Sequence, residues 1–228
     1  MTTYLDLTNR LLRRINEAEI NEPDWDAARG IHAVAKDAIL DTIRKINNKK
    51  AGWIYVAVEH TQTLTVGQEE YPWPVGWANV DWNSFQIQKD DNLSQEPYHL
   101  TYINRDKWYS ELRDLDYNSG TDGRDLPYYV FPAHGQGWGV SPSPNQEYTI
   151  KYRYFKNPDT LSLPTDIVVI PERFDYVIIS GGLYHLSLFR DNPENTALTK
   201  QEFDENLGDM IRQQIMWPKR MDDTRLGG

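Results

Sequence analysis

The sequence predicts an α+β fold: a four-helix bundle built from both ends of the chain, with an antiparallel β-sheet or barrel domain inserted between its second and third helices. Three observations lead to this prediction. Apolar residues follow helical spacing near both ends of the chain. The middle has short alternating segments separated by turns rich in proline and glycine. Neither terminal pair of helices can bury its apolar stripe alone, so helices from both ends are expected to pack together.

Residues 1–52 are expected to form the first half of the bundle. The first helix runs from Tyr4 to about Ala18, and Thr3 with Asp6 resembles a capping box at its start. The second helix runs from about Asp24 to Asn48. Small residues on its apolar stripe predict a close approach to another helix, and the stripe consists of Ala28, Ile31, Ala35, Ala38, Ile39, Thr42 and Ile46.

Residues 53–160 are expected to form the inserted β domain. Alternating or β-branched segments predict strands at 54–58, 61–66, 84–89, 99–103 and 148–154. An amphipathic stretch from Arg105 to Leu115 predicts a short helix within this domain.

Residues 161–216 are expected to complete the bundle. A stretch from Phe174 to Leu188 is apolar nearly all round, which predicts a buried third helix. Asn192 and Pro193 have the pattern of a cap and a first-turn proline, and the fourth helix then runs to about Met216. Residues 217–228 have little to bury and are expected to form a flexible C-terminal tail.

The bulk composition limits the classes of protein to consider. The chain of 228 residues contains no cysteine, which excludes disulfides, thiolate metal sites and a cysteine nucleophile. Its formal charge of −10 argues against a protein that grips nucleic acid. No apolar run is long enough for a membrane span, and the first residues do not resemble a signal peptide. We therefore expect a virion or cytosolic protein without membrane contact, and interpret a basic stripe of Arg10, Arg13 and Arg14 as a solvated helix face.

No specific catalytic motif is present, so we expect a non-enzymatic protein without a cofactor or a metal. The five histidines form no metal-ligand spacing; they are His32, His60, His99, His134 and His185. The glycines of GQGWG lie among prolines without a following helix, which indicates a turn and not a phosphate loop. Carboxylate pairs of the glycosidase type cannot be read from sequence alone, so a virion hydrolase hidden in the β domain stays an open alternative.

The most unusual local feature is an aromatic loop, by which we mean Tyr71, Trp73, Trp77 and Trp82 together with the prolines between them. Three interpretations remain open. The rings belong to the core of the β domain, they form a contact surface for another protein, or they form a platform on which a sugar stacks. The last interpretation defines an alternative function, a lectin-like carbohydrate-binding module of a tail or virion.

The layout resembles the head-to-tail adaptor family of tailed phages. The resemblance is carried by TTYLDLTNRLLRRINEAEI, by ARGIHAVAKDAILDTIRKIN followed by AGWIY, and by the closing pair of helices. Tail tubular protein A of short-tailed phages has the same organisation. The resemblance covers nearly the whole chain and is more specific at residues 2–55 and 145–216 than in the middle. The aromatic loop has no counterpart in it.

The resemblance implies a structural virion protein at the head–tail connector, assembled in the host cytoplasm. Such adaptors form a dodecameric ring between the portal protein and the tail nozzle protein, and the ring lines the channel through which the genome passes without specific binding. The helices and the C-terminal segment are expected to face the portal, and the β domain the nozzle. We expect the tail to bind the portal through Trp217, Arg220, Met221 and Leu226, and the aromatic loop is a possible contact on the tail side.

Overall fold

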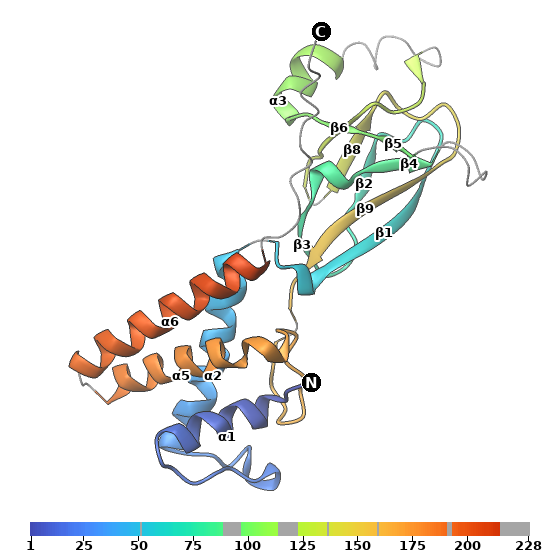
Figure 1. The fold of residues 1–228 in the computed structure, drawn as a ribbon. Helices are drawn as coiled ribbons and strands as arrows, with labels where there is room; N and C mark the ends of the chain where they lie inside the picture. Colours follow the sequence, from blue (N-terminus) through green and yellow to red (C-terminus); the bar gives the residue numbers. More distant parts are fainter. Residues whose placement is uncertain are drawn as a thin grey trace. The chain divides into compact units, whose positions relative to one another are not determined.

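The computed structural model, shown in Figure 1, describes residues 1–50, 52–88, 97–113, 123–135, 137–158, 160–190 and 193–214. The chain divides into two compact units: a helical unit, Met1–Tyr55 with Pro158–Gly228, and a β unit, Val56–Asn157. Helices from both chain ends therefore belong to one unit, and the strands belong to the other. The fold is mixed α+β.

Helix α1, Tyr4–Arg14, begins at the predicted capping box. The Thr3 hydroxyl accepts a hydrogen bond from the Asp6 backbone N–H at 3.1 Å, and the Asp6 carboxylate accepts one from the Thr3 N–H at 3.1 Å. The helix ends before the predicted Ala18, because Asn16 adopts a left-handed conformation with φ of 58°.

Helix α2, Ile31–Lys49, begins later than predicted. Glu22–Asp24 forms only a single 3-10 turn, and Gly30, with φ of 59°, directly precedes the helix. The intervening Trp25 is buried and donates its indole N–H to the Ser162 carbonyl at 3.2 Å. A tertiary contact, and not helical spacing, therefore fixes the segment before α2.

Helices α5, Asp175–Phe189, and α6, Pro193–Gln214, lie side by side (Figure 1). Helix α5 packs against α1, α2 and α6, as expected for a helix that is apolar nearly all round. One representative apolar residue from each of the four helices is buried, namely Leu11, Ile39, Ile178 and Leu207. The four-helix bundle itself stays a prediction.

Two glycines of α5 lie where neighbouring helices come close. A Cβ atom on Gly181 would collide with Thr42 Cγ2 of α2 and would lie 2.8 Å from Phe203 Cε2 of α6. A Cβ atom on Gly182 would lie 2.8 Å from Leu11 Cδ2 of α1. Thr42, on the predicted stripe of the second helix, thus lies directly against Gly181 of α5.

Two sheets make up the described part of the β unit. The first contains β1 (Ala57–Leu64), β9 (Tyr148–Lys156), β4 (Gln86–Gln88) and β5 (Tyr98–His99) in that order, with β3 (Trp77–Val80) also paired to β9. The second contains β2 (Glu70–Pro72), β8 (Gly137–Ser141), β7 (Tyr129–Pro132) and β6 (Thr101–Tyr102). Pairing is antiparallel except between β6 and β7. The sheets do not form a closed barrel, so the barrel alternative is wrong.

Several predicted strands have different bounds in the structure. The pair expected at 54–58 and 61–66 is instead a 3-10 turn, Ile54–Val56, followed by β1, whose eight residues all pair with β9. No glycine or proline interrupts the alternation there, so the chain has no reason to turn. The segment 99–103 is divided between β5 and β6, which belong to different sheets. The short helix is present as α3, Arg105–Lys107, and a π-helix, Trp108–Leu112.

The two sheets share one aromatic core. Phe85, Trp138 and Tyr152 are buried together, and the rings of Phe85 and Tyr152 stack with centroids 4.5 Å apart. Tyr152 lies on β9 of the first sheet, and Trp138 lies on β8 of the second. Aromatic side chains that bury large areas therefore hold two small sheets together.

Candidate functional site

The aromatic loop is held against the core of the β unit. Its turn has Gly76 at φ of 78°, and the Trp77 N–H donates to the Pro74 carbonyl at 3.3 Å, the geometry of a turn that requires glycine at its third position. Trp73 packs between Trp77 and Trp82, with centroid distances of 4.8 Å and 5.7 Å. All three indoles are partly buried against the shared core.

The structure gives the predicted loop residues different environments. Tyr71 is buried, stacks on Trp138 with centroids 5.0 Å apart, and donates its hydroxyl hydrogen to the Gln68 carbonyl at 2.9 Å. The planes of Trp73 and Trp82 cross at 72°, whereas a sugar-stacking platform needs exposed, coplanar rings. The part of the loop most available to a partner is the Val75 side chain at the tip of the turn, which is 98% exposed. Val75 could not be singled out from the sequence, because one valine between Pro74 and Gly76 forms no unusual pattern.

The basic stripe on α1 does more than face solvent. The guanidinium of Arg10 pairs with the Asp175 carboxylate of α5 at 2.6 Å, and the Thr2 hydroxyl donates to the same oxygen at 2.8 Å. The Asp175 side chain is only 7% exposed. Burial raises the pKa of this carboxyl above its ordinary value, and the hydrogen bonds from Thr2 and Arg10 act in the opposite direction. Arg10 is therefore a structural contact between helices distant in sequence.

The other two arginines of the stripe remain exposed. Arg13 pairs with Glu19 at 2.7 Å, and both side chains are about half exposed. Arg14 has no carboxylate within ion-pair distance in the part of the chain that the structure describes. Positions 10, 13 and 14 share one face of α1, so these charges act on the same space.

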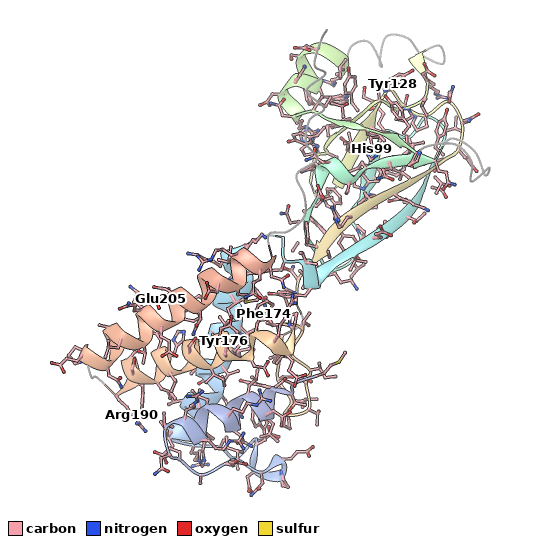
Figure 2. The ribbon with its side chains drawn as sticks, viewed as in Figure 1. His99, Tyr128, Phe174, Tyr176, Arg190 and Glu205 are labelled. Atoms are coloured by element: carbon pink, nitrogen blue, oxygen red, sulfur yellow. The ribbon has the colours of Figure 1, made fainter. Side chains whose placement is uncertain are left out.

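That space is a cleft between α1, α5 and α6, with a volume of about 590 Å³, which we call the arginine cleft. Ile179 and Leu183 of α5 supply an apolar floor, and Glu202 and Asn206 of α6 line the far wall. Tyr176, labelled in Figure 2, also lines it and is 43% exposed. A concave site with a guanidinium wall and an apolar floor suits a peptide segment that carries an apolar anchor and a carboxylate.

The described residues contain no group of three or more histidine, aspartate or glutamate side chains arranged to hold a metal ion. Burial lowers the pKa of His60 and of His185 below the ordinary histidine value. Among the helices that the structure describes, none is both long and apolar enough to cross a membrane.

The predicted portal-binding residues lie outside the described residues. Trp217, Arg220, Met221 and Leu226 all follow Gln214, the last residue that the structure describes. Their role stays a prediction.

The arginine cleft and the exposed tip of the aromatic loop are surfaces suited to contact with other chains. A family model described as SU10 adaptor protein matches residues 2–224, which spans both units. The chain belongs to the SU10 adaptor protein family and is a phage adaptor. The family assignment implies interaction with other virion components, and structural adaptors of this kind are typically non-enzymatic. A comparison with curated proteins gives no match.

Proposed function

We propose that the chain is a head-to-tail adaptor that forms a dodecameric ring between the portal and the tail nozzle, lining the channel through which the genome passes. The observation that carries this proposal is the match to the adaptor family over residues 2–224. We further propose an organisation like that of tail tubular protein A, with helices α1, α2, α5 and α6 as a four-helix bundle. In this organisation residues 1–52 and 161–216 form the bundle and residues 53–160 form the inserted domain.

The charge of the chain agrees with a conduit. A formal charge of −10 disfavours tight binding of phosphates, and each phosphate contact in a channel would slow the passage of DNA. The proposed channel therefore passes the genome without gripping it.

The bundle and the C-terminal tail are proposed to contact the portal. The tail contains the apolar residues Trp217, Met221 and Leu226 beside the positively charged Arg220, a composition that suits a groove with an acidic rim. A segment that orders only on binding loses its conformational entropy at that moment, so the buried anchors must supply most of the affinity.

The aromatic loop is proposed as the contact with the nozzle. Trp73, Trp77 and Trp82 pack on each other and on the core, which keeps the loop in one conformation and lowers the entropy lost on binding. Tyr71 supports the loop from the buried side, and Val75 supplies the exposed apolar tip.

Mass measurement of the chain mixed with the portal protein tests the central proposal. The expected result is a closed assembly containing twelve copies of this chain on the portal ring. A chain that remains monomeric and does not associate with the portal at any salt concentration would contradict the proposal.

A truncated chain lacking residues 217–228 tests the portal-binding segment. Its thermal melt should be nearly unchanged, because the segment has little apolar content, whereas its binding to the portal should weaken strongly. If the truncation unfolds the protein, the tail is part of the core. If portal binding is unchanged, the contact lies elsewhere.

A further inference from the structure

We propose that the arginine cleft receives the α5–α6 tip of a neighbouring copy of this chain, so that each subunit in the ring inserts its tip into the cleft of the next. By the α5–α6 tip we mean the described residues 188–190 at the end of α5 and 193–198 at the start of α6. The proposal rests on the proposed function, because a ring needs repeated contacts between copies.

The tip presents apolar side chains. Leu188, Phe189 and Leu198 are 50%, 61% and 67% exposed. They lie together at one level of the helix pair, because the hydroxyls of the adjacent Ser187 and Thr199 are 3.0 Å apart. Exposed apolar side chains gathered in one place indicate a contact surface more strongly than single ones do.

The tip also carries a negative charge beside its apolar residues. Glu194 is exposed and has no ion-pair partner in the described ranges. Glu194 and Leu198 are four residues apart on α6 and so share one face of the helix. The tip therefore combines an apolar anchor with a carboxylate, the two features that the arginine cleft fits.

The cleft offers the complementary groups. Arg14 lacks a carboxylate partner among the described residues, while Ile179 and Leu183 form the apolar floor beside it. A Glu194 carboxylate from a neighbour would pair with Arg14, and Leu198 or Phe189 would cover the floor.

Charge also decides the symmetry of this contact. Two clefts facing each other would bring the Arg14 guanidiniums of the two copies together, which disfavours a contact of the cleft with itself. The cleft and the tip lie toward different ends of α5, as the labelled Tyr176 and Arg190 show in Figure 2. A contact between two different surfaces of the same chain is heterologous, and such contacts close into a ring when the rotation between copies allows it.

Engineered cysteines test the contact directly, because the natural chain has none. Full-length Tyr176→Cys and Leu198→Cys variants would be mixed with portal protein under mild oxidation and separated on a non-reducing gel. The expected product is a dimer of one Tyr176→Cys chain and one Leu198→Cys chain. A control mixture of Glu59→Cys, an exposed position of β1, with Leu198→Cys should give no dimer.

Charge reversal supplies a second, independent readout. Arg14→Glu should raise the concentration needed for assembly about tenfold, which corresponds to roughly 1.4 kcal/mol per contact, and so should Glu194→Arg. The two changes combined in one chain should restore assembly, because the pair is reversed between neighbours. Arg29→Glu makes the same charge change at an exposed position away from the cleft and should leave assembly unchanged.

The outcomes separate this inference from the proposed function. Normal rings without the 176–198 crosslink, or rings indifferent to Arg14→Glu, overturn the cleft contact and leave the adaptor proposal standing. If the Tyr176→Cys chain crosslinks to portal protein instead, the portal occupies the cleft, and the proposed contact between copies is overturned. The proposed contact between copies is also overturned if Arg14→Glu leaves assembly unchanged and alters only how strongly the ring retains DNA. If the natural chain never assembles, both proposals fail.

Discussion

Replacement of Gly181 by alanine gives a sharp test of how closely α5 approaches α2 and α6. Alanine gains about 1 kcal/mol of helix propensity over glycine, so in an exposed helix the change would stabilise the protein. Here the new methyl would collide with Thr42 Cγ2, and would lie 2.8 Å from Phe203 Cε2 and 2.9 Å from Thr42 Oγ1. Overpacking of this kind costs about 1–3 kcal/mol.

Thr42 cannot easily move away from the new methyl group. It is fully buried, its hydroxyl donates to the Ala38 carbonyl at 2.7 Å, and its branched Cβ favours few rotamers within a helix. We therefore expect an overpacking penalty in the upper part of that range, about 2–3 kcal/mol, which exceeds the gain of about 1 kcal/mol in helix propensity. The Gly181→Ala variant should lose about 1–2 kcal/mol of unfolding free energy in total.

Gly182→Ala is the matched control on the next residue of the same helix. The atoms nearest its new methyl are Leu11 Cδ2 at 2.8 Å, Leu11 Cδ1 at 3.2 Å and Ile39 Cδ1 at 3.3 Å. These are the ends of flexible side chains, which can shift by a few tenths of an ångström. The unfolding free energy of this variant should stay within about 1 kcal/mol of the natural chain.

Urea unfolding followed by the helical circular dichroism signal measures these differences. Adding Thr42→Ser to Gly181→Ala removes the colliding Cγ2 and keeps the hydroxyl, so the double variant should recover most of the lost stability. The packing argument is refuted if Gly181→Ala is as stable as the natural chain, or if Thr42→Ser gives no relief.

Two further predictions concern the helices of the same unit. Asp6→Ala should cost about 0.3–1 kcal/mol at neutral pH, because it removes the carboxylate half of the capping box and a negative charge from the first turn, while the Thr3 hydroxyl still accepts from the backbone N–H of residue 6. The hydrogen bonds with Thr3 lower the pKa of Asp6, so its stabilisation is present above the ordinary carboxyl pKa and is lost as pH falls through the lowered value. Urea titrations should show that the unfolding free energies of the variant and the natural chain converge at acid pH. A difference that does not depend on pH would show that the ionised Asp6 carboxylate is not the source of the stabilisation. Leu11→Ala and Leu207→Ala should each cost about 2–5 kcal/mol, and an unmoved melting temperature would contradict the four-helix bundle.

Features encoded locally could be predicted from the sequence. The capping box of Thr3 and Asp6 depends on two residues three positions apart, and the alternation of β9 is visible within one segment. The start of α2 could not be predicted, because Trp25 is held by the Ser162 carbonyl from a distant segment. The division of 99–103 between two sheets likewise depends on partners elsewhere in the chain, since β5 pairs with β4 and β6 with β7.

Some features of the candidate surfaces could likewise be predicted from the sequence, and others could not. The sequence identified the aromatic loop and the basic stripe, because unusual residues are close together there. It did not reveal that Arg10 pairs with Asp175, because the two residues are 165 positions apart and neither has a local signal for the other. The cleft exists only once α1, α5 and α6 are brought together, and the exposure of Val75 depends on how the turn is held.

The ends of the β unit have a consequence for how such proteins diversify. Ala57, the first residue of β1, pairs with Phe155, near the end of β9, so the chain enters and leaves this unit across adjacent strands, about 5 Å apart. An insert whose two ends meet can be exchanged for another, or shortened to a turn, without a change in the path of the helices. If the β unit contacts the tail as proposed, recombination between phages that exchanges this unit would fit the adaptor to a new tail component and leave the helical sequence unchanged.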